Sequence, residues 1–308
     1  MTTGARVEEF EQLRPHLLAV AYRLTGTLVD AEDIVQDAWL RWSANHDTSI
    51  NDLKAWLTTV TSRLGLDRLR SAVHRRETYV GDWLPEPVVT GFDGTDPLAS
   101  VVASEDARFA AMVVLERLTP DQRVAFVLHD GFGVPFDEIA DVLGSTPAAA
   151  RQLASRARRA VSDAPPPVAE HDEIVGKLMA AMATGDVEAV VAVLHPDVTF
   201  TGDSNRRAPT AARTIHGADK VARFLIGLAR RYGPRLLEAG RPALVNGELG
   251  LYNERMDTGG QWPEIQPHIQ ALTVRDGLVC AIWDIANPDK FSASPLNRER
   301  ARLHIDTP

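Results

Sequence analysis

Residues 136–161 read FDEIADVLGSTPAAARQLASRARRAV, a pattern of two short helices separated by a glycine. The apolar residues of the first helix recur at the spacing of one helical face, at Phe136, Ile139, Ala140 and Leu143. Gly144 then supplies a turn, and Thr146-Pro147 is typical of an N-cap followed by the first residue of a helix. Two short helices joined by a tight turn predict a helix-turn-helix.

The second helix of this pair carries the side chains that we expect to contact DNA. Arg151, Gln152 and Ser155 lie near its N-terminal end, where a recognition helix reads base edges. Arg156, Arg158 and Arg159 follow and are placed for phosphates. A solvated basic face on a structural helix is the alternative interpretation.

A second basic segment lies upstream, in a predicted helix at about residues 53–72 and the residues after it. It combines hydroxyls, an aromatic ring and arginines, which suit a strand whose bases are unstacked or flipped out. The candidate DNA contacts here are Trp56, Thr59, Ser62, Arg63, Arg68, Arg70, Arg75 and Arg76. Trp56 taken alone is also typical of a core residue.

Two further helices are predicted before this segment. Apolar residues at helical spacing run to Leu24, and Gly26 ends the helix. Asp30 is expected to be the N-cap of the next helix, residues 31–42. The outer face of that helix is acidic, which is the wrong charge for DNA.

Composition and charge fit a folded protein with local basic patches. The chain has 308 residues and a net charge of −9, but residues 63–76 hold five arginines against one acid. The single cysteine, Cys280, excludes an internal disulfide framework. We find no secretory signal and no apolar run long enough to cross a bilayer, so a cytoplasmic protein without membrane association is expected.

The remainder of the chain divides at prolines. Residues 78–100 are rich in Pro and Gly, yet Trp83-Leu84-Pro85 is too apolar for a free tether and is expected to dock. After the spacer Ala164–Val168, two helices lead into strands at residues 198–201, 243–245, 249–252, 269–274 and 279–285, with a helix at 218–231. Turns at Asn246-Gly247 and Asp276-Gly277 indicate an α+β domain with an antiparallel sheet.

We also considered an enzyme. His195, Asp203 and Asp284 could perform general acid–base work in a pocket of this last domain. No metal-ligand spacing, nucleophile elbow or glycine-rich phosphate loop appears, so no cofactor, metal or catalytic residue is predicted.

Several of these segments resemble one family. Asp30–Trp39 (DAEDIVQDAW) resembles region two of the extracytoplasmic-function (ECF) sigma factors of bacterial RNA polymerase. Ala55–Arg76 resembles the following part, which in that family opens and reads the minus-ten promoter element. Residues 118–123 (LTPDQR) and the helix-turn-helix resemble region four, which reads the minus-thirty-five element. The segments also occur in the family's order.

Residues 83–87 (WLPEP) in the linker and residues 287–291 (NPDKF) near the end resemble signatures of one subgroup. Members of this subgroup fuse a SnoaL-like domain of the nuclear-transport-factor-like cone fold to the sigma core. The regulatory residues that this resemblance implies are Trp83, Leu84, Pro85, Asp203, Asn287, Pro288, Asp289, Lys290 and Phe291. Where the subgroup usually has an Asp-Gly-Gly-Gly-Lys loop, this chain has Asp203-Ser204-Asn205-Arg206-Arg207. The acid and a basic end remain, but the glycines are absent.

The resemblance implies a multidomain chain with two all-α sigma modules, the second with the helix-turn-helix, and a C-terminal α+β cone domain. We expect region two at residues 1–78, a linker at 79–103, region four at 104–163, a Pro-rich spacer at 164–171 and the SnoaL-like domain at 172–308.

The resemblance also implies partners. The acidic face, Asp30, Glu32, Asp33, Gln36 and Asp37, would bind the β′ clamp helices of core RNA polymerase, the β flap is a second expected contact, and promoter DNA is the other partner. We hypothesise that Asn287–Phe291 packs on Trp83–Pro87 and that the cone domain, with a possible small-molecule ligand, controls activity in cis. Two alternatives stay open: a ligand-sensing helix-turn-helix regulator and a SnoaL-type cyclase or isomerase.

Overall fold

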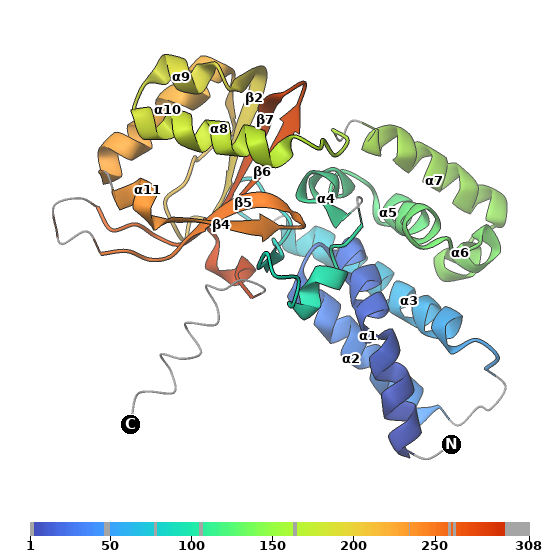
Figure 1. Cartoon of the computed structure of the whole chain (residues 1–308). Coiled ribbons are helices and arrows are strands. Elements are labelled where there is room, and N and C mark those ends of the chain that lie inside the picture. The colour runs from blue at the N-terminus through green and yellow to red at the C-terminus, as the bar shows by residue number, and fades with distance from the viewer. Residues whose placement is uncertain are drawn as a thin grey trace, which may run out of the picture. The chain divides into compact units, whose positions relative to one another are not determined.

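A computed structural model describes residues 3–45, 50–76, 79–104, 107–162, 165–233, 235–257, 260 and 263–292 (Figure 1). The chain forms two compact units. The first comprises Met1–Thr78, Pro97–Ala107 and Ala111–Ala164, and the second comprises Tyr79–Asp96, Arg108–Ala110 and Pro165–Pro308. Residues 79–96 of the linker predicted at 79–103 therefore belong to the same unit as the C-terminal residues. No helix in the described ranges is both long and apolar enough to cross a membrane.

The first unit begins with three packed helices: α1 (Thr3–Thr25), α2 (Leu28–Ala44) and α3 (Leu53–Arg76). Their buried faces include Phe10, Leu17, Val35 and Leu57. Gly65 on α3 is needed for this packing, because a Cβ there would lie 2.8 Å from Leu24 Cδ1 of α1. Burial of these faces, rather than helix propensity, holds the three helices together.

The predicted N-cap of α2 is wrong by three residues. The helix begins at Leu28, and the Thr27 hydroxyl accepts a hydrogen bond from the Asp30 backbone N–H at 3.3 Å. Thr27 has the extended backbone that an N-cap requires. This earlier start buries Leu28 and leaves the Asp30 carboxylate for another partner.

The rest of the first unit is the predicted helix-turn-helix and the helical segments before it: η1 (Pro97–Ser100), α4 (Phe109–Leu115) from Ala111 onward, α5 (Pro120–Phe126), a π-helical turn (Val127–Gly131), α6 (Phe136–Leu143) and α7 (Pro147–Val161). Thr119 and Gln122 form a capping box at the start of α5. Gly144 ends α6 in the left-handed conformation, with φ 63°, and the Thr146 side chain caps α7. The helix-turn-helix prediction is confirmed.

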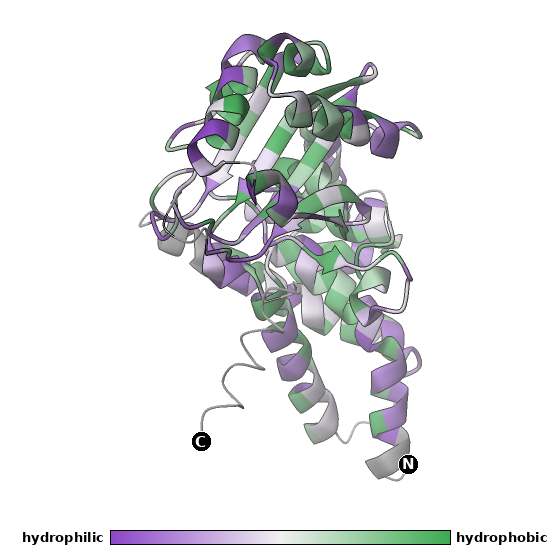
Figure 2. Cartoon of the chain, turned by 60° about the vertical axis from the view of Figure 1, so that its left-hand side comes forward, coloured by the Kyte–Doolittle hydropathy of each residue, from purple (hydrophilic) through white to green (hydrophobic). Residues whose placement is uncertain are grey.

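The second unit is a seven-stranded sheet with helices. Its strands are β1 (Val89–Thr90), β2 (Leu194–Asp203), β3 (Ile215–His216), β4 (Gly240–Val245), β5 (Glu248–Asn253), β6 (His268–Arg275) and β7 (Leu278–Ile285), in the order β1-β4-β5-β6-β7-β2-β3. The helices are α8 (His171–Thr184), α9 (Val187–Val191), α10 (Ala218–Tyr232), α11 (Arg235–Ala239) and the 3-10 turn η4 (Pro288–Lys290). Apolar side chains from α8, α10 and the strands form one core, and Figure 2 shows hydrophobic residues along the strands beneath the helices.

The sheet is mixed, so the expectation of an antiparallel sheet is wrong at one pair. Both predicted hairpins form, and Asn246, Gly247, Asp276 and Gly277 all have positive φ, as tight hairpin turns require. However, β2 and β7 pair in parallel. These two strands lie at opposite ends of the domain's sequence, so no turn residue signals how they pair.

The linker contributes a strand that the sequence did not predict. β1 pairs antiparallel with β4, and Asn246 and Val88 exchange two hydrogen bonds at 2.8 and 3.0 Å. The linker is therefore hydrogen-bonded to the edge of the sheet.

Candidate functional site

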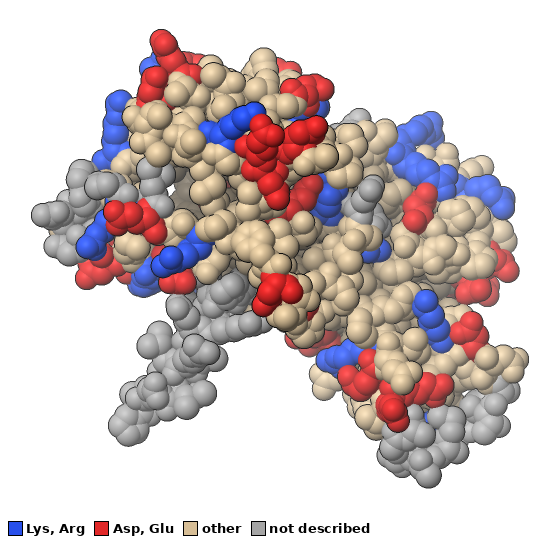
Figure 3. Space-filling view, in the orientation of Figure 1, with Lys and Arg blue, Asp and Glu red and all other residues tan. Residues whose placement is uncertain are grey.

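The recognition helix α7 presents its whole predicted contact set at the surface. Ala150, Ala154 and Ala157 face the core, and this leaves the polar side chains on the opposite face. The exposed residues are Arg151, Gln152, Ser155, Arg156, Arg158 and Arg159. Figure 3 shows basic side chains gathered over this helix. Two of them are held in place: the Arg151 guanidinium lies 5.0 Å from the Phe136 ring centroid, and Arg158 pairs with Asp130 at 2.5 Å.

The hydroxyl residues of α3 lie mostly inside. Ser62 is fully buried and donates to the Thr58 carbonyl at 2.6 Å, while Thr59 is half-buried. Trp56 packs against Trp42 with ring centroids 5.9 Å apart. In this arrangement Ser62 and Trp56 contribute to packing, and the arginines form the polar surface of the helix.

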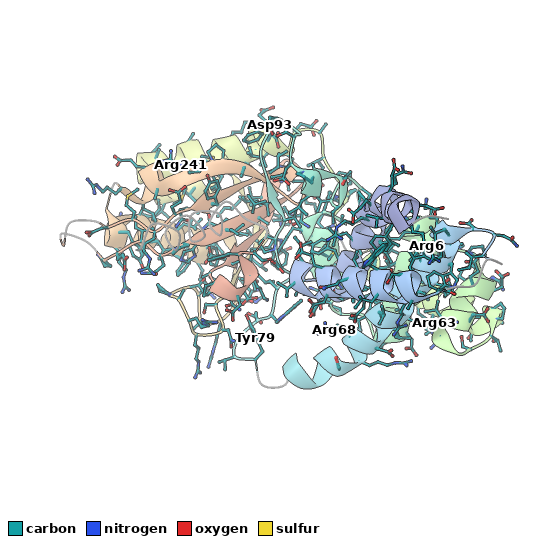
Figure 4. The ribbon with its side chains drawn as sticks, turned by 90° about the horizontal axis from the view of Figure 1, so that it is seen from below. Arg6, Arg63, Arg68, Tyr79, Asp93 and Arg241 are labelled. Carbon is teal, nitrogen blue, oxygen red and sulfur yellow. The ribbon has the colours of Figure 1, made fainter. Side chains whose placement is uncertain are left out.

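Three arginines of α3, Arg63, Arg68 and Arg70, have acidic or carbonyl partners within the first unit. Arg68 pairs with Asp30 at 3.4 Å and Asp33 at 3.1 Å, both on α2. Arg70 pairs with Asp121 of α5 at 3.0 Å, and Arg63 donates to the Asp141 carbonyl of α6 at 3.3 Å. Figure 4 labels Arg63 and Arg68, with Arg63 toward the green helices. The side chains of Arg75 and Arg76 lie outside the described residues.

The acidic face of α2 is exposed except at its start. Glu32, Asp33, Gln36 and Asp37 are exposed, whereas Asp30 is half-buried beside Arg68. Leu40 continues this face and is 55% exposed. A helix face that combines acids with an exposed leucine is suited to a protein partner rather than to DNA.

His16, on α1, contacts Thr58 of α3 and Phe132, which follows the π-helical turn. Its Nε2 lies 3.0 Å from the Thr58 hydroxyl, and its ring meets the Phe132 ring edge-on at 5.3 Å. Burial, with the nearby charges of Lys54 and Arg23, lowers the pKa of His16 to about 4. His16 is therefore neutral in the folded protein at neutral pH.

Acid should destabilise the first unit through His16. The unfolded chain binds a proton near pH 6.5 and the folded chain only near pH 4, so stability falls as the pH drops between those values. Relative to His16→Gln, the wild type should lose about 1–3 kcal/mol from pH 7 to pH 4 in urea unfolding. The exposed His216→Gln is the control and should track the wild type. A parallel loss in His16→Gln would contradict the assignment.

The C-terminal motif holds the linker through a buried ion pair. Lys290 Nζ lies 2.5 Å from Asp203 Oδ2, and both side chains are almost completely buried. Asp203 Oδ2 also accepts from the Leu84 N–H at 2.7 Å, and Lys290 Nζ donates to the Leu84 carbonyl. We call the set Tyr79, Trp83, Leu84, Asp203 and Lys290 the Lys290 clamp.

Aromatic rings complete the clamp. Lys290 Nζ lies 4.0 Å from the Trp83 ring centroid and 5.1 Å from that of Tyr79. The Tyr79 hydroxyl donates to Asp203 and accepts from Asn287 at 2.9 Å. Burial and the hydrogen bond and charge of Asp203 raise the pKa of Tyr79, so the phenol keeps its proton. Outside the clamp, Ser292 donates to Glu86 of the same linker motif.

The loop after Asp203 makes its contacts without glycines. Asn205 and Arg206 have φ of 46° and 58°, the left-handed region that favours glycine. Asn205 Oδ1 accepts from the Val80 N–H at 3.2 Å, and Arg207 pairs with Asp289. The chain thus keeps a glycine-type backbone and uses the side chains at these positions to contact the linker and the C-terminal motif.

Arg206 should be a strained position. Arg206→Gly removes the Cβ that disfavours positive φ, and we expect it to raise the free energy of unfolding by about 0.5–1 kcal/mol. Arg206→Ala is the matched control, since it removes the exposed side chain but keeps the Cβ. If the two variants changed urea unfolding equally, the strain argument would be wrong.

The residues considered for catalysis are not brought together. His195 is beside Arg275 at 3.3 Å, Asp203 belongs to the clamp, and Asp284 lines a cavity of the second unit. There Asp284 pairs with His268 at 3.0 Å. Sequence reasoning missed His268, although strand alternation places His268, Gln270 and Leu272 on one face of β6. No group of three or more metal-ligating side chains occurs within the described ranges.

Comparison with known proteins places these sites in context. The chain matches Sigma-70 region 2 over residues 10–75, Sigma-70 region 4 over 108–161 and the SnoaL-like domain over 175–282. It is 67% identical to the ECF RNA polymerase sigma factor SigJ of Mycobacterium tuberculosis, over 96% of each chain. This chain belongs to the ECF sigma factors. Its fold superposes on the crystal structure of SigJ with a TM-score of 0.85 and 66% identity, covering 94% of this chain and 99% of that one. It is also 35% identical to the probable ECF sigma factor SigI of M. tuberculosis, over 68% of this chain and 71% of that one.

The clamp of this ECF sigma factor lies largely outside the three matched domains. Tyr79, Trp83 and Leu84 fall between the region 2 and region 4 matches, and Lys290 follows the SnoaL-like match. Only Asp203 lies inside one of them. The segment between the two sigma matches and the segment after the SnoaL-like match therefore both contact one buried acid, Asp203.

Proposed function

We propose that this sigma factor binds core RNA polymerase and directs transcription from specific promoters, under control in cis by its SnoaL-like domain. The observation that carries the first part is α7, which presents six polar or basic side chains on one exposed face of a capped recognition helix. The two sigma modules in one chain support a promoter reader over a lone helix-turn-helix regulator.

Core polymerase would bind α2. Its exposed acids Glu32, Asp33 and Asp37 complement a basic partner, and Leu40 supplies an apolar contact on the same face. Asp30 would instead hold Arg68 in place, because it is half-buried and pairs with that arginine.

Promoter DNA would be read by two helices. Arg151, Gln152 and Ser155 of α7 would meet base edges of the upstream duplex, and Arg156, Arg158 and Arg159 would meet phosphates. On α3, Arg63, Arg68, Arg70, Arg75 and Arg76 would follow the melted strand, with Thr59 beside them. Ser62 and Trp56 would act there only after local rearrangement, since both contribute to packing here.

The arrangement of the first unit would have to open on the promoter. Elements named for positions minus ten and minus thirty-five lie about 25 base pairs apart, or about 85 Å at ~3.4 Å per base pair. Here Arg70 of α3 and Asp121 of α5 are 3.0 Å apart. The same contacts that hold the modules together occupy arginines proposed for DNA, so opening and DNA access would coincide.

Promoter reading by α7 can be tested with the full-length chain. Arg151→Ala should lower run-off transcription by core polymerase from the promoter upstream of the protein's own gene by about tenfold or more. Binding to core polymerase should stay unchanged. Arg223→Ala, exposed on α10, is the matched control and should transcribe like wild type. No specific transcript from the unaltered chain would refute the proposal.

Control in cis would act through the Lys290 clamp. It holds residues 79–84, which connect the two sigma modules, to the SnoaL-like domain. While the linker is bound there it is not free to extend between separated modules. The clamp would therefore restrain the opened, DNA-binding form.

Breaking the clamp should raise promoter output. Lys290→Met keeps the length of the side chain but removes its charge, and we expect run-off transcripts to increase severalfold. Lys220→Met, at an exposed position of α10, is the matched control and should have no effect. Circular dichroism of both variants would establish that they are folded. Unchanged output from folded Lys290→Met would count against control through the clamp.

We also propose that the chain works in the cytoplasm with the polymerase and catalyses no reaction of its own. The second statement rests on the separate partners of the three residues considered for catalysis: His195 lies beside Arg275, Asp203 pairs with Lys290, and Asp284 pairs with His268.

A further inference from the structure

The SnoaL-like domain encloses a cavity that the proposed sigma function does not use. Its volume is about 480 Å³, within the ~300–1,000 Å³ range of small-molecule sites. Most of the wall is apolar, from helices α8 and α10 and the strands, and includes Met182, Phe200, Phe224, Leu228, Leu251 and Ile282. Such a wall favours a largely hydrocarbon molecule.

One part of this wall carries a buried polar cluster. Asp284 of β7 accepts hydrogen bonds from His268 Nδ1 at 3.0 Å, Gln270 Nε2 at 3.1 Å and the Thr210 hydroxyl at 2.5 Å. All four residues line the cavity. The Asp284 side chain is 3% exposed and that of His268 is 15% exposed, so the imidazole is the more accessible partner.

The imidazole of His268 offers one ring nitrogen, Nε2, to the cavity. Burial opposes charge on His268, but the charge and hydrogen bond of Asp284 outweigh it and raise the pKa of His268. Burial likewise opposes charge on Asp284, but the charge of His268 and the three hydrogen-bond donors outweigh it and lower the pKa of Asp284. Nδ1 is occupied by Asp284, and Nε2 has no hydrogen-bond partner among the residues that the structure describes. With His268 protonated, the ion pair is neutral as a whole and an N–H donor is left at Nε2.

We propose that this cavity binds a neutral, largely hydrocarbon molecule with one oxygen that accepts a hydrogen bond from His268 Nε2, and that occupancy is transmitted to the Lys290 clamp. A charged ligand is disfavoured, because Asp284 already neutralises His268 and a second buried charge would lack a counter-ion there. Arg231, the other cationic residue in the wall, is exposed.

Two short stretches of chain connect the cavity to the clamp. Along β7, Asp284 is followed by Ile285, and the next two backbone N–H groups, of Ala286 and Asn287, donate to the Asp203 carbonyl at 2.7 and 3.0 Å. Asp284 and Asp203 are also adjacent in the β2–β7 register, because Gly202 pairs with Asp284 and Asp203 with Ile285.

The second stretch is the loop from Asp203 to Thr210. At one end its Asn205 contacts Val80 of the linker, and at the other Thr210 donates to Asp284. Gly202 lets this loop lie flat on β2, since a Cβ there would collide with the Thr210 side chain. A ligand that orders His268 and Asp284 would thus order both segments that bear the clamp.

The experiment uses the full-length chain and 6-propionyl-2-(dimethylamino)naphthalene, a neutral fluorescent ketone whose emission shifts to the blue in apolar sites. We expect saturable binding with a blue shift. The analogue without the propionyl group should bind about tenfold more weakly, the value of one charge-assisted hydrogen bond. Leu228→Trp fills the cavity and should abolish binding, whereas Val7→Trp, on the exposed face of α1, should not.

Transmission is measured by amide hydrogen exchange of residues 79–90 and 284–292, with and without the ketone. Slower exchange in both segments, absent in Leu228→Trp, is the expected result. Binding that is unsaturable, or equal in Leu228→Trp and Val7→Trp, would overturn the site, and binding without a change at 79–90 would overturn the transmission. The transmission to activity rests on the proposed sigma function, but ligand-free run-off transcription tests that function separately, so the two can fail independently.

Discussion

The ion pair between Lys290 and Asp203 is the constraint on which the second unit depends. Two buried charges are costly unless every polar atom has a partner, and breaking one side of such a pair typically costs about 3–5 kcal/mol. Here the partners come from the linker: the Leu84 N–H and carbonyl, the Tyr79 hydroxyl and the Trp83 ring. Removing the linker would leave both charges without those groups. Residues 79–96 are therefore a structural part of the SnoaL-like domain, although they lie between the two sigma modules in sequence.

This connectivity distinguishes the chain from a sigma factor paired with a separate inhibitor. A separate protein can dissociate, whereas here residues 79–96, which lie between the two sigma modules in sequence, belong to the same compact unit as the SnoaL-like domain. Under the proposed control in cis, loss of the hydrogen bond from Leu84 to Asp203 would increase the free length of chain between α3 and α5. The strand pairing of Val89 and Thr90 with β4 extends the same attachment.

Sequence reasoning succeeded where a local signal exists. The helix-turn-helix follows from Gly144 and Thr146, and the two hairpins follow from Asn246-Gly247 and Asp276-Gly277, because each of these residues sets the backbone at its own position. It failed where the determinant is distant. The parallel pairing of β2 with β7, the strand at Val89–Thr90 and the His268–Asp284 pair all join residues that no short motif connects. Family resemblance pointed to most residues of the Lys290 clamp. Only the structure shows that Lys290 and Asp203 form an ion pair.

Ion pairs at the surface of the first unit differ in kind from the clamp. Arg68 bridges to Asp33 and Arg70 to Asp121 with partly exposed side chains, and such pairs contribute only about 0–1 kcal/mol each. They hold Arg68 and Arg70 in position, and releasing either arginine from its partner costs little free energy. Asp33 lies on the face proposed for core polymerase, so a basic partner there would compete with Arg68 for the same carboxylate. Engagement of α2 would then free an arginine of α3 for the DNA strand, and polymerase binding and promoter reading would be linked through one exchangeable contact. The buried Lys290 clamp cannot exchange partners so easily. It is therefore suited to hold the linker on the SnoaL-like domain until another event releases it.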